Sequence, residues 1–102
     1  MEFNVIIQND AYEDMRNISD YIALSLSAPQ AAFKLIDKFE REFLRIGNFP
    51  FSGAKIRSSN FSLPYLWSRI DNYMIFYIVD EPLHTVYIMR ILYGASDYLT
   101  DL

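Results

Sequence analysis

Apolar residues recur at helical spacing in two neighbouring segments of the first half of the chain. The first stripe consists of Ala11, Met15, Ile18, Ile22 and Leu26, and the second of Ala32, Leu35, Ile36, Phe39, Phe43 and Ile46. Asn9-Asp10, with Glu13 three residues after Asp10, resembles a capping box and predicts where the first helix begins. Pro29 lies between the stripes, and proline is tolerated in the first turn of a helix but not in its interior. So short a connection predicts an antiparallel helical hairpin.

Four shorter segments have the composition of strands, one before the helices and three after them. They are residues 3–7, 63–70, 73–79 and 85–92. Asp71-Asn72 and Asp80-Glu81-Pro82 provide turn residues between the last three, whereas glycine, proline, serine and asparagine mark residues 47–62 as a loop. The predicted order is β-α-α-β-β-β. It describes an α+β fold with the helical hairpin packed on one face of a small, mainly antiparallel sheet.

The strand predicted at residues 73–79 is apolar on both faces, which a single helical layer cannot cover. On one face it carries Tyr73, Ile75, Tyr77 and Val79, and on the other Met74, Phe76 and Ile78. An apolar second face predicts a partner, a groove or burial by loops. The tail, residues 95–102, is expected to form a helical turn.

Length and composition fit a single intracellular domain. The chain has 102 residues, which suits one domain spanning 1–102, and 52% of them are hydrophobic. Cysteine is absent, which removes thiolate chemistry and suits a reducing compartment. The first residues lack the pattern of a signal peptide, and no apolar run is long enough to span a bilayer. We therefore predict a cytoplasmic protein that makes no contact with a membrane.

Charge is distributed unevenly along the chain, whose net charge is −4. Acidic residues outnumber basic ones in residues 1–46, whereas residues 47–70 contain Lys55, Arg57 and Arg69 and no acid. An acidic protein is not expected to bind nucleic acid freely, because phosphate binding depends on lysine and arginine. The locally positive stretch is either an ordinary solvated loop or a binding surface.

Common catalytic motifs do not occur in the sequence. The only histidine, His84, falls in a turn and is expected to be an ordinary surface residue. No metal-ligand cluster, glycine-rich phosphate loop or nucleophile elbow is present, and no metal or cofactor is expected. The remaining candidate is Arg90, since a charge in an apolar strand has to be paired or used. Alternation predicts that Arg90 shares a face with Ile88 and Leu92.

Two interpretations of Arg90 follow from the residues alone. In the first, Arg90 lies in a shallow groove of basic residues and tyrosines. Lysine and arginine there would stabilise a phosphorane-like charge, and tyrosine would stack on a base or move a proton, which allows RNA cleavage without histidine or metal. In the second, Arg90 pairs with Asp71 or Asp97 and the tyrosines belong to the core. The sequence leaves both open.

A series of short strings resembles one protein family. The strings are Asp20-Tyr21-Ile22, Ala28-Pro29-Gln30-Ala31-Ala32, Phe49-Pro50-Phe51-Ser52-Gly53, Tyr73-Met74-Ile75-Phe76-Tyr77, and Arg90-Ile91-Leu92-Tyr93-Gly94 with Asp97 after it. Their order and spacing resemble the RelE/ParE superfamily of toxins from bacterial type II toxin–antitoxin systems. The resemblance implies a growth-inhibiting toxin in a hetero-oligomer with its cognate antitoxin, which would cover apolar surface of the toxin.

Branches of that superfamily differ in their target. RelE-like members cut mRNA in the ribosomal A site, whereas ParE-like members inhibit DNA gyrase and lack the catalytic set. A RelE-like function would make the chain a metal-independent endoribonuclease with catalytic Arg90, Tyr93 and Arg69, and with Lys55 and Arg57 binding the substrate. The string of residues 90–94 with its following aspartate looks more ParE-like, and toxins that enter the ribosome are usually strongly basic. A third alternative is a degenerate toxin that only binds its antitoxin.

Overall fold

The helices and strands follow the predicted order, with one additional short strand. The computed structural model describes residues 2–56 and 63–94. The elements are β1 (Asn4–Ile7), α1 (Asn9–Asp20), the π-helical turn η1 (Tyr21–Ser25), α2 (Pro29–Asn48), β2 (Ala54–Lys55), β3 (Leu66–Ile70), β4 (Tyr73–Asp80) and β5 (Thr85–Tyr93). Arg57, Asp97 and the helical turn predicted in residues 95–102 lie outside the described residues.

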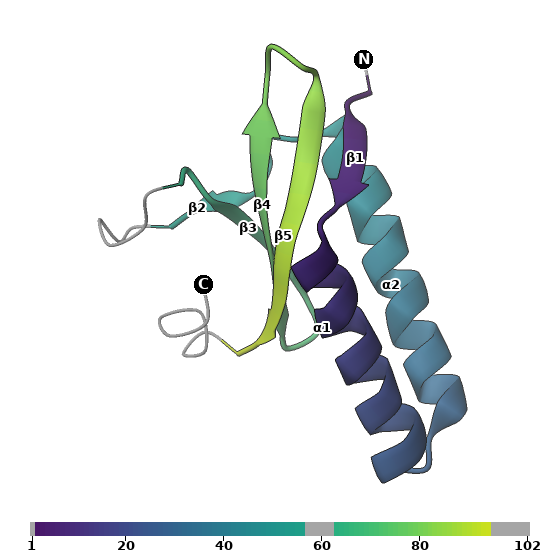
Figure 1. Cartoon of the computed structure of the whole chain (residues 1–102). Helices are drawn as coiled ribbons and strands as arrows, with labels where there is room; N and C mark the ends of the chain where they lie inside the picture. Colours follow the sequence, from purple (N-terminus) through teal and green to yellow (C-terminus); the bar gives the residue numbers. More distant parts are fainter. Residues whose placement is uncertain (1, 57–62, 95–102) are drawn as a thin grey trace.

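The five strands form one mixed sheet with the helices on one side. The strand order is β1-β5-β4-β3-β2, in which β1 runs parallel to β5 and all other neighbours are antiparallel. The chain descends through α1 and returns through α2, so the helices form an antiparallel hairpin beside the sheet (Figure 1). The predicted α+β fold is therefore confirmed.

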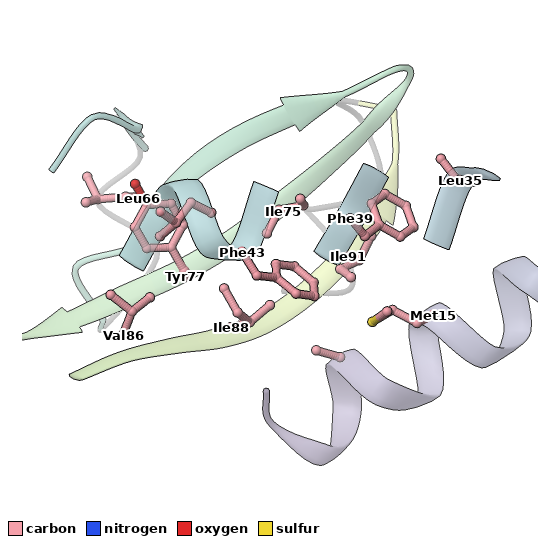
Figure 2. Close-up of a cluster of buried hydrophobic side chains, with 12 residues drawn as sticks. Met15, Leu35, Phe39, Phe43, Leu66, Ile75, Tyr77, Val86, Ile88 and Ile91 are labelled. Carbon is pink, nitrogen blue, oxygen red and sulfur yellow. The ribbon is translucent and has the colours of Figure 1, made fainter. Parts of the chain in front are cut away.

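The main core lies between the helical hairpin and the sheet. Phe39 and Ile46 of α2 are fully buried, and they pack in one cluster with Ile75 of β4 and Ile88 of β5. Figure 2 shows Phe39, Ile75 and Ile88 reaching from α2 and the strands into one shared layer. Burial of each large apolar side chain contributes about 1.5–3 kcal/mol. This layer is what holds the hairpin on the sheet.

The face of the sheet away from the helices has a smaller core. Met74, Phe76 and Leu92 are buried there, and Tyr65 and Trp67 are among the partly buried residues that pack around them. The rings of Tyr65 and Phe76 meet edge to face, with centroids 6.5 Å apart. The middle of the doubly apolar sheet is thus buried on both faces.

Four local predictions were wrong: the side-chain cap of α1, the end of the first helix, the loop at 47–62 and the start of β3. Gln8 precedes α1, and no side chain caps that helix; the N–H of Gln8 donates to the Ile88 carbonyl at 2.9 Å, so the ladder of β1 leads directly into the helix. Glu13 instead pairs with Arg16 at 3.0 Å. The first helix does not continue as an α-helix to Leu26, because it changes to the wider η1 turn, in which Leu26 N–H donates back to residue 21. The predicted loop at 47–62 contains the end of α2 and the short strand β2, and β3 begins three residues later than predicted, at residue 66.

One extra residue in β5 reverses the predicted faces of that strand. Phe76 pairs with Arg90, whereas the next residue, Tyr77, pairs with Ile88, so one residue of β5 has no partner on β4. Such a β-bulge interrupts the alternation of side chains. Ile88 therefore belongs to the helix-side core and Leu92 to the opposite face. The prediction that Arg90 shares a face with both is wrong: by register it shares only the face of Leu92.

Candidate functional site

Arg90 is held by Asp14 of α1 through two hydrogen bonds. Its Nε donates to Oδ2 at 2.7 Å and its Nη2 to Oδ1 at 3.0 Å. Asp14 Oδ2 also accepts the backbone N–H of Ile91 at 2.9 Å. The side chains of Arg90 and Asp14 are 25% and 13% exposed, so the pair is largely removed from water. Asp71, one of the predicted partners, instead accepts hydrogen bonds from Lys38.

The topology explains why Asp14 reaches this strand. β1 pairs with β5 only over residues 85–88, and α1 begins two residues after β1 ends. The helix therefore runs beside the rest of β5, where backbone donors need an acceptor. Asp14 supplies one to Ile91 and a bidentate, charge-assisted partner to Arg90. The ion pair thus joins α1 to the open edge of β5.

Arg69, the second predicted catalytic arginine, lies on the same face of the sheet as Arg90 but forms its hydrogen bond with the β3–β4 turn. Arg69 lies opposite Met74, two strand spacings from β5, which is on the order of 10 Å. Its Nε donates to the Asp71 carbonyl at 2.8 Å, so the side chain folds onto the β3–β4 turn. The tyrosine whose ionisation responds to Arg90 is Tyr65: burial raises the pKa of Tyr65, and the positive charge of Arg90 opposes that rise.

Tyr93 and Lys55, the other described members of the predicted set, lie on the helix-facing side of the sheet. Tyr93 pairs with Tyr73, whose ring it meets edge to face at 5.2 Å, and it is 57% exposed. Lys55 lies opposite Leu66, a helix-side core residue, at the far edge of the sheet. The described members of the predicted catalytic and substrate-binding set are therefore divided between the two faces.

His84 is not the ordinary surface residue that the sequence suggested. Its ring stacks on Phe3 with centroids 3.8 Å apart, and its backbone adopts a φ of 53° in the turn before β5. The Nε2 atom is buried and has no hydrogen-bond partner among the described residues. The imidazole therefore serves as a packing element in the part of the chain that the structure describes.

A buried polar network, which sequence reasoning missed, joins α2 to the sheet. Glu42 is only 8% exposed and accepts hydrogen bonds from Arg45 Nε at 2.8 Å and from the hydroxyl of Ser68 in β3. Burial by itself raises the pKa of Glu42, but the hydrogen bonds from Arg45 and Ser68 outweigh it and hold the pKa below its ordinary value. Its position was a usable signal, because Glu42 falls between Phe39 and Ile46 at the spacing of the apolar stripe.

The network continues into the segment that follows α2. Arg45 Nη1 donates to Ser52 Oγ at 3.2 Å, and Ser52 Oγ donates to the Phe49 carbonyl at 2.7 Å. The N–H of Gly53 donates to the hydroxyl of Tyr77 at 3.0 Å, and burial raises the pKa of Tyr77. A Cβ on Gly53 would lie 2.3 Å from that hydroxyl, so only glycine fits. These bonds fix residues 49–53 against the sheet.

Two of the hollows on the described surface lie next to predicted site residues. One, of about 850 Å³, lies between the helical hairpin and the β3–β4 turn, and Tyr21, Tyr73 and Tyr93 are among its lining residues. The other, of about 390 Å³, lies beside β2 and includes Lys55. Within the described residues, no cluster of histidine and acidic side chains could hold a metal ion. No helix in the same part of the chain is long and apolar enough to cross a bilayer.

Three solved structures that share this fold are of toxin–antitoxin systems. The chromosomal ParDE system of P. aeruginosa aligns with a TM-score of 0.69 at 18% identity, covering 92% of this chain and 98% of that chain. The RelBE2 complex of Mycobacterium tuberculosis aligns with a TM-score of 0.62 at 18% identity, covering 91% and 99%. The archaeal RelE–RelB complex of Pyrococcus horikoshii OT3 aligns with a TM-score of 0.55 at 16% identity, covering 94% and 99%. At these identities the likeness establishes the fold, which is that of RelE/ParE toxins.

A family model matches most of the sequence. Residues 5–98 match the family described as the ParE toxin of the type II toxin–antitoxin system parDE. The chain therefore belongs to the ParE toxin family, which confirms the resemblance found in the sequence. No curated protein matches the chain.

Proposed function

We propose that this toxin is neutralised by a cognate antitoxin and that, when free, it stops growth by binding DNA gyrase and not by cutting mRNA. Membership of the ParE family supports the toxin and the gyrase target. The observation that carries the choice between binding and cleavage is the position of Arg90. The cleavage hypothesis needs this residue at the reacting phosphate.

A nuclease site requires its groups to converge on one phosphate within hydrogen-bond reach. Arg69 and Arg90 lie on one face of the sheet by register, whereas Tyr93 and Lys55 lie on the other. The guanidinium of Arg90 is engaged by the Asp14 carboxylate, which offsets the positive charge that would stabilise a transition state. The arrangement favours a structural role for Arg90.

The charge of the molecule agrees with a protein target. A net charge of −4 opposes the approach to RNA, for which affinity depends on several lysine or arginine contacts to phosphate. Binding to a protein rests on buried apolar and aromatic side chains and needs no excess of positive charge.

The antitoxin partner is supported by the surface of the helical hairpin. Large apolar side chains are exposed there, including Tyr21, Leu24, Leu26 and Phe33, and Phe33 is 82% exposed. Exposed apolar patches of this kind mark interaction sites. The solved structures that share the fold are themselves toxin–antitoxin complexes.

The proposal is tested by induced expression in bacteria with the rates of DNA and protein synthesis followed separately. We expect growth to stop, DNA synthesis to fall first, and co-expression of the neighbouring antitoxin gene to restore growth. An immediate stop of protein synthesis with cut mRNA would overturn the gyrase target. Continued growth would indicate a degenerate toxin that only binds its antitoxin.

A further inference from the structure

We infer that the free chain forms a symmetric dimer in which the exposed face of α2 packs antiparallel against the same face of a second copy. The residues that carry the contact, here called the α2 stripe, recur at alternating intervals of four and three along the helix. They are Gln30, Lys34, Asp37, Arg41, Leu44 and Asn48, and all six are exposed. Such intervals place side chains on the seam that meets a facing helix. The inference goes beyond the proposed function, because it concerns self-association and not the target.

The charges of the α2 stripe complement themselves when the two helices run antiparallel. In a pair centred on residue 39, position 37 of each copy faces position 41 of the other, so Asp37 meets Arg41 twice. Opposite charges that face one another across an interface fix its register. In a parallel pair Asp37 would face Asp37 and Arg41 would face Arg41, and both contacts would be repulsive. The charge pattern therefore selects the antiparallel arrangement.

Asp37 and Arg41 retain enough hydrogen-bonding capacity for a contact with a second copy. Within α2 the Nε of Arg41 lies 2.9 Å from Oδ2 of Asp37, and the two side chains are 79% and 56% exposed. A guanidinium has five N–H donors and a carboxylate has about four acceptor positions. Each group can thus pair within its own helix and across the dimer at the same time, which joins four charges into one network.

The same register places the leucine of the α2 stripe over a hollow. A shallow hollow of about 320 Å³ near the start of α2 is lined by Pro29, Gln30, Phe33 and Lys34. Position 44 of the second copy faces position 34, so its Leu44 lies above this hollow and beside Phe33. Leu44 is 63% exposed and Phe33 is 82% exposed in the single chain. Insertion of one side chain between four residues of a facing helix is how paired helices pack, and it removes both apolar groups from water.

The size of the contact determines how tightly the copies are held. α2 has 20 residues and is about 30 Å long. A contact along one helix belongs to the small class of protein interfaces, so we expect the dimer to dissociate on dilution. The antitoxin is proposed above to cover Phe33, and a bound antitoxin would therefore exclude the second copy. The dimer is thus a form of the free toxin.

The test is sedimentation velocity of the purified full-length chain over a series of concentrations. We expect the mass to rise with concentration from 12.0 kDa towards twice that value. Two variants, Asp37→Arg and Arg41→Asp, each place like charges opposite one another. We expect each alone to dimerise on the order of tenfold more weakly, because two symmetric pairs change from attraction to repulsion. An equal mixture should dimerise as well as the unaltered chain, since arginine then faces aspartate at both contacts.

A matched pair of leucine variants tests the hollow. Leu44→Lys sets a lysine opposite Lys34 of the second copy and should weaken the dimer on the order of tenfold. Leu83→Lys makes the same change at a leucine that is also 63% exposed but lies in the turn before β5, and it should leave the dimer unchanged. Equal effects of the two variants would contradict the position of Leu44 in the interface.

Crosslinking tests the direction of the helices, and the absence of native cysteine makes it specific. Gln30→Cys and Asn48→Cys lie 18 residues apart, which is about 27 Å along a helix. On oxidation we expect a disulfide in a mixture of the two variants and none in either variant alone. A disulfide within Gln30→Cys alone would show a parallel pair and overturn the inference. So would a mass of 12.0 kDa at every concentration, which would show that α2 is a solvated face, or a charge-variant mixture that remains monomeric.

Discussion

Removal of the Asp14 carboxylate tests directly whether Arg90 is a structural residue. Asp14→Ala takes away the acceptor that the Arg90 guanidinium shares with the Ile91 N–H. Breaking a fully buried ion pair costs about 3–5 kcal/mol. The side chain of Arg90 is 25% exposed, so water recovers part of that cost, and we expect a loss of about 2–3 kcal/mol in the free energy of unfolding.

A double-mutant cycle with Arg90→Leu isolates the energy of the Asp14–Arg90 contact, and urea unfolding of the four proteins measures it. We expect a coupling above about 1 kcal/mol, as for a charge-assisted bidentate pair. The exposed Glu13–Arg16 pair is the matched control, with side chains 57% and 67% exposed and an expected coupling below about 0.5 kcal/mol. If the first coupling is no larger than the second, the structural role of Arg90 is refuted.

Three further predictions concern the core and the buried network. Gly53→Ala forces a Cβ against the Tyr77 hydroxyl and should lower the free energy of unfolding by about 3 kcal/mol, as measured in urea. An unchanged unfolding midpoint would contradict the prediction, because it would show that residues 49–53 move aside at little cost. The pKa of Glu42 is lower in the folded state than its ordinary value of 4.5, so its contribution to stability is present above that pH and is lost as the pH falls below it. Melting temperatures should therefore fall less steeply on acidification for Glu42→Gln than for the unaltered protein or for the exposed control Glu40→Gln, and identical slopes would contradict the network. Phe39→Ala should cost about 3–5 kcal/mol in the same unfolding assay, and a cost below about 1 kcal/mol would contradict its place in the core.

Most of the fold could be predicted because local patterns specify it. The apolar stripe of α2 predicted its buried face, since Leu35, Phe39 and Ile46 are buried as the spacing requires. The turn at Asp71-Asn72 was predicted from residue type, and Asp71 does adopt a positive φ of 53° there. Helical periodicity and turn chemistry act over a few residues, so a single sequence records them.

The candidate site could not be predicted because it depends on contacts between distant segments. Asp14 and Arg90 are 76 residues apart, and no local pattern relates them. The β-bulge opposite Phe76 and Tyr77 carries no glycine or proline to mark it, yet it moves Arg90 to the face opposite Ile88. A one-residue irregularity reverses every later side chain of a strand.

The buried network of Glu42, Arg45 and Ser68 could not be predicted for a similar reason, since it also joins distant segments. Residue type alone places Glu42 on a solvated face, because glutamate in a helix usually contacts water. Only the packing of α2 on β3 shows that Ser68 and Arg45 satisfy its carboxylate. The Phe49–Gly53 string resembles a family feature in the sequence, but only the structure shows the contact of Gly53 with Tyr77.

Inhibition of purified DNA gyrase is the most direct test of the central claim that this ParE-family toxin binds its target and cuts no RNA. The purified chain is titrated into a supercoiling reaction, and in parallel into a translation reaction whose mRNA is analysed by primer extension. We predict loss of supercoiling with intact mRNA. Cleavage of the translated mRNA at the ribosomal A site with full gyrase activity would contradict the account.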